Sequence, residues 1–295
     1  MSTKKRKIGF YAFKVISPDG KTFAVKDPRI LIKACNAIMA AAPKDRSVLI
    51  PEEHRYYSLH SMANNGKQTF MQLVTAKYHH RPPLVHVHLH TIRQSPKHLS
   101  EGEEEPVHIV LKINGDECLL LLEERKVGIS VVRLRDLFNE FLRRFARSPN
   151  DNFSAAYRLI PKKNFLEEVN KLTRVTLGEL YLEKKILGSE FLDYSNRTES
   201  LRSDIALVVQ PTRGNCVRDV IVDAYQKYLL GARLEKQITR IRVSGENPDG
   251  GVISFDTEKM RLIRHIDVDL DDDTGLVDSS SLRSKMSQIM DEIDA

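Results

Sequence analysis

Tryptophan is absent from this 295-residue chain, and cysteine occurs only three times, as Cys35, Cys118 and Cys216. An odd number of cysteines at wide spacings, none of them in a C-x-x-C pair, indicates neither a disulfide framework nor a structural zinc site. Each cysteine is therefore expected to be a small buried apolar residue in a reducing compartment.

Long apolar runs are also missing. No stretch of about 18 apolar residues occurs, and no apolar segment of signal-peptide length follows the basic N-terminus MSTKKRKIGF. We therefore expect a soluble, cytoplasmic protein that does not insert directly into a membrane.

The motifs of several enzyme classes are absent as well. The sequence has no G-x-x-x-x-G-K-[ST] loop, no G-x-G-x-x-G after a strand, no G-x-S-x-G elbow and no H-E-x-x-H helix. The acidic string DVDLDDDTG at residues 267–275 lacks the glutamate that closes a calcium-binding loop. We therefore expect no catalytic residue, no cofactor and no metal, and we interpret the acidic string as a strand end followed by a solvated turn.

What the chain does have is an uneven distribution of charge. Its net charge is +6, yet residues 266–295 contain nine acidic and two basic side chains, which leaves 44 basic and 31 acidic side chains in the remainder. A basic body is typical of proteins that bind a polyanion, and an acidic end could compete for the same surface. The charge therefore favours nucleic acid as a partner.

The periodicity of apolar residues predicts strands and helices in alternation. A strand is expected at residues 8–16, and a helix follows, with Asp27 as N-cap, Pro28 at its first position and Pro43 beyond its end. Hairpins are expected around Asn64–Gly66 and around Asn114–Gly115, the second with a type I′ turn.

The second half of the chain continues in the same way. A basic amphipathic helix is expected within residues 133–149, and a linker at residues 148–155. Further helices are expected near residues 163–172, 215–231 and 280–293, and further strands near 174–183, 204–211, 238–256 and 261–270. Hairpins separated by single helices predict an α+β fold of antiparallel sheets with flanking helices. We assign residues 1–150 and 215–295 to a main domain and residues 151–214 to a smaller inserted domain.

Three histidines alternate in the segment PLVHVHLHTI, as His86, His88 and His90. A period of two predicts a strand with the imidazoles on one face and Val85, Val87 and Leu89 on the core side. Two such histidines could bind one ion, so a metal-dependent nuclease or hydrolase that uses His86 and His88 stays open as an alternative. The strand supplies no carboxylate, and we favour a polar, metal-free histidine face.

Basic side chains occur in several separate segments and form no recognition helix, zinc finger or aromatic RNA-binding motif. Such residues predict contacts with the phosphate backbone, and therefore salt-sensitive binding of double-stranded DNA that depends little on sequence. In the helix within 133–149, the favoured interpretation is instead structural, with the arginines offsetting the helix dipole and pairing with Asp136 and Glu140. The candidate DNA-binding residues are Arg133, Arg135, Arg143, Arg144, Arg147, Lys184, Lys185, Arg213, Arg218, Arg240 and Arg242.

Four segments carry a resemblance to a known family: GFYAF (9–13), YYSLHSMANNGKQTFMQLVTAK (56–77), INGDECLLLLEERKVGISVVRLRDLFNEFL (113–142) and SDIALVVQPTRGNCVRDVI (203–221). Their order resembles that of the RexA-like phage-exclusion proteins, and the two ends of the chain also look similar to an uncharacterised bacterial family, DUF4747. The RexA-like resemblance implies a homodimer that binds DNA without strong sequence preference, as the related RdgC ring does. It further implies a role in anti-phage defence together with a membrane-effector partner protein. The histidine segment, HLSEGEEEP and the acidic end have no counterpart in that pattern.

Overall fold

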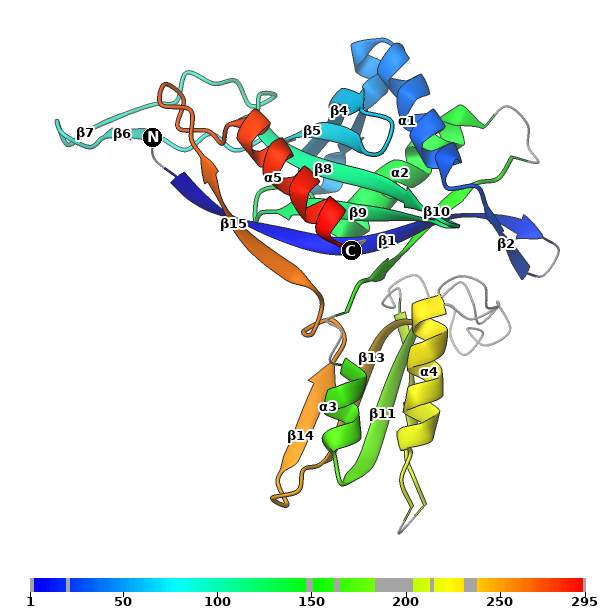
Figure 1. The fold of residues 1–295 in the computed structure, drawn as a ribbon. Helices are drawn as coiled ribbons and strands as arrows, with labels where there is room; N and C mark the ends of the chain where they lie inside the picture. The colour runs from blue at the N-terminus through cyan, green and yellow to red at the C-terminus, as the bar shows by residue number, and fades with distance from the viewer. Residues whose placement is uncertain are drawn as a thin grey trace.

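The computed structural model describes residues 3–19, 22–146, 151–161, 165–183, 204–212, 215–230 and 238–293. It confirms the expected α+β fold: a nine-stranded and a four-stranded sheet, both antiparallel, are flanked by helices (Figure 1). A separate two-stranded hairpin projects from the larger sheet. No helix among the described residues has the length and apolarity needed to cross a bilayer.

The larger sheet is organised by one long strand, β1 (Thr3–Asp19). Residues 7–13 of β1 pair with β9, while residues 3–9 pair with β15 and residues 11–16 with β10. The main path of the sheet runs β10-β1-β9-β8-β5-β4-β3, and β15 and β2 also pair with β1. The other strands are β2 (Thr22–Lys26), β3 (Ser47–Ile50), β4 (Arg55–Asn64), β5 (Thr69–Lys77), β8 (Glu105–Asn114), β9 (Glu117–Glu124), β10 (Ser154–Leu159) and β15 (Ile263–Asp269).

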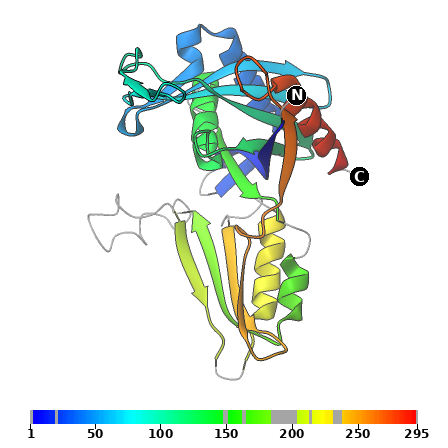
Figure 2. The same cartoon turned by 90° about the vertical axis from the view of Figure 1, so that its left-hand side faces the viewer.

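Both faces of the larger sheet are covered, so its central strands are apolar on both sides. On one face, Phe13, Leu120 and Ile109 pack against α1 (Arg29–Ala40) and α2 (Val131–Phe145). On the other face, the alternate residues Phe10 and Leu121 pack against α5 (Ser279–Glu292). The two views in Figures 1 and 2 show α5 on the opposite side of the sheet from α1 and α2.

The helices begin for local reasons. Ser130 caps α2 by accepting the Arg133 N–H, and Asp278 caps α5 by accepting the N–H groups of Ser280 and Ser281. The helix α1 begins at Arg29, one residue later than expected, although the Asp27 carboxylate still accepts the Arg29 N–H at 2.8 Å.

The smaller sheet has the order β12-β11-β13-β14, and its covering helices are α3 and α4. The strand β13 pairs with β11 over residues 174–182, so residues 238–256 belong with this sheet although we expected them in the main domain. The expected boundary at residue 214 falls between β12 and α4 of this same unit, whereas β15 and α5 return to the larger sheet. These elements are β11 (Arg174–Glu183), β12 (Asp204–Val209), β13 (Ile238–Glu246), β14 (Val252–Asp256), α3 (Phe165–Lys171) and α4 (Arg218–Leu230).

Both expected hairpins of the larger sheet form, as β4–β5 and β8–β9. The type I′ turn centred on Asn114 and Gly115 is wrong by one residue, because Asn114 pairs with Glu117 and the central residues are Gly115 and Asp116. Of these two residues, Gly115 alone has a positive φ, 60°. Glycine at the first central position with positive φ is typical of a type II′ turn.

The cysteines divide into two groups. Cys35 and Cys118 are buried as expected, and burial raises the pKa of the Cys118 thiol to about 12. Cys216, in contrast, is exposed, so its expected burial is wrong. It precedes α4, and its sulfur accepts the Val175 N–H at 3.2 Å.

Candidate functional site

The arginines of α2 lie on the solvent side of the helix and pair with nearby carboxylates. Arg143 donates to both oxygens of Glu140, at 2.8 and 2.6 Å, and Arg144 donates to the same carboxylate at 2.7 Å. Arg133 pairs with Glu53, and Arg135 pairs with Asp136 at 2.9 Å. Hydrogen bonds from Arg143 and Arg144 lower the pKa of Glu140 below its usual range.

A second group of cations lies next to the end of α2. Arg144 also donates to the Asp45 carbonyl at 2.6 Å, which brings the end of α2 beside η1 (Pro43–Arg46). Lys44 is exposed on η1, and Arg29 and Lys33 are exposed on the neighbouring α1. The structure therefore adds cations of α1 and η1 to the α2 arginines, and the sequence analysis had missed them because they are far apart in the chain.

Three other candidate cations belong to the smaller unit. Arg240 pairs with Asp256, with Nε 2.9 Å from Oδ1, and Arg242 lies 3.7 Å from Glu179. The Arg218 side chain instead donates to the Leu172 carbonyl, so it stabilises the junction between α3 and β11. These residues do not join the α2 group. Four candidates lie outside the described residues, namely Arg147, Lys184, Lys185 and Arg213.

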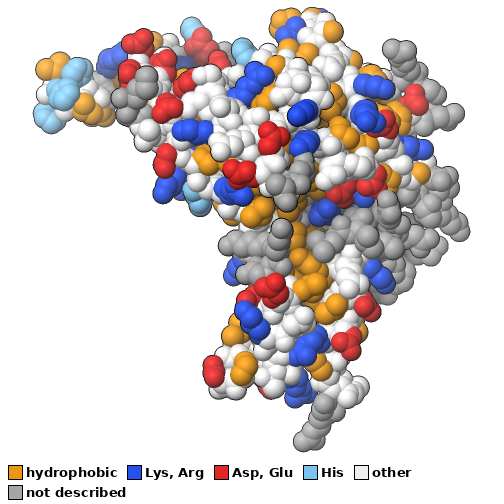
Figure 3. All heavy atoms as spheres, viewed as in Figure 1, with side chains coloured by type: hydrophobic (Ala, Val, Ile, Leu, Met, Phe, Trp, Pro, Cys, Tyr) orange, Lys and Arg blue, Asp and Glu red, His pale blue; other side chains and the backbone are white. Residues whose placement is uncertain are grey.

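The acidic end of the chain folds onto the other face of the larger sheet. Residues 263–292 contain eight acidic and three basic side chains, and they form β15, the acidic turn and α5. The sequence left open that this segment could compete for the cationic surface, but α5 packs on the face opposite α2. On the α5 side, shown in Figure 3, Lys and Arg side chains are interspersed with Asp and Glu and form no continuous strip.

The histidine segment does not form the expected strand. It folds back as a hairpin in which β6 (Leu84–His86) pairs with β7 (Thr91–Arg93), and the chain reverses at residues 87–90. His90 has a φ of 54°, and its N–H bonds to the His86 carbonyl at 2.8 Å. Val87 and Leu89, expected in the core, are 70% and 66% exposed. The physical reason is that no sheet formed by the described residues covers this hairpin, which projects into solvent (Figures 1 and 3).

This hairpin gives the metal-site alternative no additional ligand. The rings of His86 and His88 lie 6.2 Å apart, and His86 Nδ1 accepts the Leu89 N–H. Among the described residues, no group of three or more His, Cys, Asp or Glu side chains is placed to hold a metal ion.

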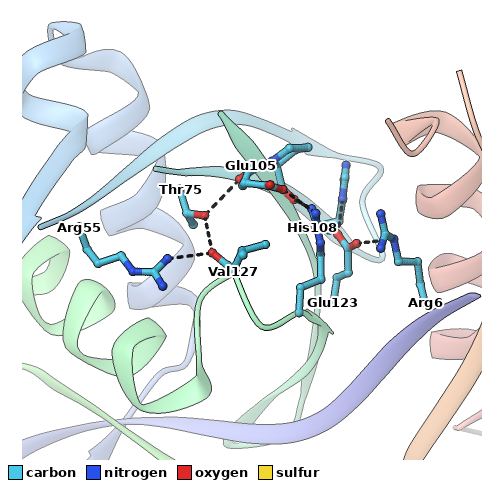
Figure 4. A network of polar contacts seen from close by, with 9 residues as sticks. Arg6, Arg55, Thr75, Glu105, His108, Glu123 and Val127 are labelled. Carbon is cyan, nitrogen blue, oxygen red and sulfur yellow. Dashed lines mark hydrogen bonds and ion pairs between the residues drawn. The ribbon is translucent and has the colours of Figure 1, made fainter. Parts of the chain in front are cut away.

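A buried polar network elsewhere was not predicted from the sequence. His108 on β8 places Nδ1 2.8 Å from Glu123 Oε2 and Nε2 2.8 Å from Ser279 Oγ. On the other side of Glu123, Arg6 Nε lies 3.1 Å from Oε1, and burial lowers the pKa of Arg6 (Figure 4). The period of two along β8 and β9 puts His108 and Glu123 on the α5 face, but the sequence gives no signal for their pairing.

The chain was compared with known proteins by two searches. No protein-family model matches the chain, and no curated protein is significantly similar to it in sequence.

Proposed function

We propose that this protein binds double-stranded DNA, largely independently of sequence, through the surface formed by α1, η1 and α2, here called the α2 face. The supporting observation is the separation of charge across the larger sheet. Residues 26–53 and 131–145, which include α1, η1, α2 and the Glu53 that pairs with Arg133, carry nine basic and six acidic side chains, while residues 263–292 on the opposite side carry three and eight. A DNA phosphate backbone is therefore attracted more strongly to the α2 face than to the acidic segment 263–292.

The existing ion pairs of the α2 face are compatible with this function. Exposed ion pairs contribute little to stability because water screens them, so a phosphate can replace a carboxylate at low cost. Arg143 and Arg144 share the single carboxylate of Glu140 and thus present two cations for one anion. Arginine is suited to this exchange because its planar guanidinium binds phosphate with two hydrogen bonds.

The wider setting of this proposal comes from the RexA-like resemblance. We infer a homodimer that acts in anti-phage defence and works with a membrane-effector partner protein. Two copies would double the number of cations that contact one duplex, and the salt dependence of binding would steepen accordingly. Light scattering of the purified protein tests the dimer directly. If the protein is a monomer and still binds DNA, the dimer is not part of its function.

The test of DNA binding is a titration against random duplex DNA at about 50 and about 200 mM salt, with and without a chelator. We expect affinity to fall steeply with salt, and the double variant Arg143→Glu/Arg144→Glu to lose most of it. The matched control is the double variant Lys227→Glu/Lys259→Glu, which reverses two exposed charges in the smaller unit. Equal binding by the Arg143→Glu/Arg144→Glu variant and the control would contradict the proposal, and chelator-sensitive cleavage on a gel would instead support a metal-dependent nuclease.

A further inference from the structure

We propose that Ser279 is a nucleophile, activated by His108, for the hydrolysis of small carboxylic esters with an apolar acyl group. The site lies on the α5 side of the larger sheet, opposite the surface to which we assign DNA binding. It extends the function beyond DNA binding and depends on a different set of residues.

Three side chains from separate elements form the required chain of contacts. Ser279 Oγ lies 2.8 Å from His108 Nε2, and His108 Nδ1 lies 2.8 Å from Glu123 Oε2. Serine, histidine and a carboxylate in this order are the groups that activate a hydroxyl for attack on a carbonyl carbon, on any fold that brings them together. Here the fold brings together β8, β9 and the first residue of α5.

The partners of His108 determine which of its nitrogens carries the proton. A carboxylate can only accept a hydrogen bond, so Glu123 selects the tautomer with hydrogen on Nδ1. The Nε2 lone pair then accepts the Ser279 hydroxyl, as a general base requires. Glu123 itself is fixed in place, because its side chain is only 1% exposed and Arg6 lies against its other oxygen.

A cavity of about 250 Å³ opens beside the two reacting groups. His108 and Ser279 both line it, and Phe70, Val110 and Met286 make much of its wall apolar. Pockets for drug-sized ligands have volumes of roughly 300 Å³ or more, so this cavity is suited to a small acyl group. It thus supplies an apolar acyl site directly next to the nucleophile.

The same cavity contains a cation that could stabilise the charge of the transition state. Asp278 already accepts the N–H groups of Ser280 and Ser281, so these backbone donors are engaged. Arg283 lines the cavity, with its guanidinium carbon 4.0 Å from the centre of the Phe70 ring. We assign to Arg283 the stabilisation of the negative oxygen that develops from the ester carbonyl.

The reaction follows from these positions. Ser279 Oγ forms a bond to the carbonyl carbon while its proton moves to His108 Nε2. The C–O bond of the ester then breaks, and the same proton passes to the departing alkoxide to give an alcohol. Water next attacks the acyl-serine, again losing a proton to Nε2, and this proton returns to Ser279 Oγ as the carboxylic acid leaves. One ester and one water thus give one acid and one alcohol.

The test is covalent labelling of the full chain with a fluorophosphonate, read by intact mass and peptide mapping, together with the hydrolysis of p-nitrophenyl butyrate. We expect one adduct on Ser279, which is absent in Ser279→Ala and unchanged in Ser284→Ala, an exposed serine on the same helix. His108→Gln should slow hydrolysis about 100-fold or more. Should Ser279→Ala not fold, Ser279→Cys keeps the size of the side chain and should replace fluorophosphonate labelling by iodoacetamide labelling at residue 279, which peptide mapping distinguishes from labelling of the exposed Cys216.

A purely structural network would give a different result. In that case Ser279→Ala would lower the melting temperature, but the wild-type protein would carry no label and hydrolyse no ester, which would overturn the proposal. A label elsewhere, or hydrolysis that survives Ser279→Ala, would overturn it equally. Glu123 is a positioning residue in this scheme: Glu123→Gln should shift the pH profile of kcat/KM, and Glu123→Asp should restore it, whereas a structural role would change the melting temperature alone.

Discussion

Glu140 offers a sharp test of the α2 face because its removal should strengthen DNA binding. Its carboxylate accepts hydrogen bonds from Arg143 and Arg144, and it is thus the competitor that a phosphate must displace. Glu140→Gln keeps the size of the side chain and removes the charge. Arg143 is then available to DNA without the loss of an ion pair, and Arg144 is available through the part of its guanidinium that does not donate to the Asp45 carbonyl.

The size of the effect follows from the exposure of the two pairs. Arg143 is 71% exposed, whereas Arg144 and Glu140 are 29% and 24% exposed, and both pairs have the i,i+3 or i,i+4 spacing on a helix surface. Pairs of this kind are weak, so releasing two of them should tighten binding by a factor of about 3 to 5. The salt dependence should steepen as well, because the two arginines then release more counterions from DNA.

Fluorescence anisotropy with a labelled random duplex measures this change, and Glu258→Gln is the matched control. Glu258 pairs with Arg240 in the smaller unit at 2.9 Å, so this variant changes the net charge equally but away from the α2 face. Affinity that rises equally in both variants would show only an effect of net charge. Affinity that is unchanged in Glu140→Gln would refute the assignment of Arg143 and Arg144 to the DNA contact.

The pH dependence of DNA affinity gives a second test of the role of Glu140. The pKa of Glu140 is lowered, chiefly by the hydrogen bond from Arg143, so its charge persists to a pH below the usual glutamate range. The stability that this carboxylate contributes is fully present above its unfolded pKa and is lost as pH falls through its folded pKa. The DNA affinities of the wild type and Glu140→Gln should therefore converge only at such low pH.

Four further predictions concern the fold. Phe138→Ala should lower the free energy of unfolding by about 3 to 5 kcal/mol, measured by urea titration, because this ring is fully buried against Phe13. Gly245→Ala should cost about 1 to 3 kcal/mol in the same assay, since a β-carbon there would lie 2.4 Å from the Arg174 carbonyl oxygen. Val87→Ser should change it by less than about 0.5 kcal/mol because the side chain is exposed. The hydrogen-exchange protection factors of α5, which are corrected for the intrinsic pH dependence of exchange, should fall as pH falls through the lowered pKa of Asp278, and Asp278→Asn should remove this dependence.

Most helices and strands could be predicted because each has a local cause. The period of apolar residues predicts α2 and both hairpins of the larger sheet, whereas the cap predicted at Asp27 places the start of α1 one residue too early. Domain boundaries had no such local cause. The pairing of β11 with β13 joins residues that are 56 to 72 positions apart. The sequence of neither strand indicates which strand it pairs with.

The histidine hairpin shows why a period of two is insufficient evidence of burial. Alternation indicates two different faces, but only a covering layer makes one of them a core face, and the segment around Val87 has none. The candidate site could not be predicted from local sequence either. The pairing of His108 with Ser279 spans 171 residues, so it depends on how α5 packs on the sheet.

The packing of α5 also explains how one sheet could support both proposals. The acidic segment 263–292 lies across the sheet from the α2 face, where its carboxylates do not pair with the cations that we assign to DNA. Exposed charges separated by more than about 10 Å are largely screened at 0.1 M salt, which further limits competition across the sheet. The same charge separation that directs a polyanion to α2 thus leaves the α5 side accessible to a small uncharged ester.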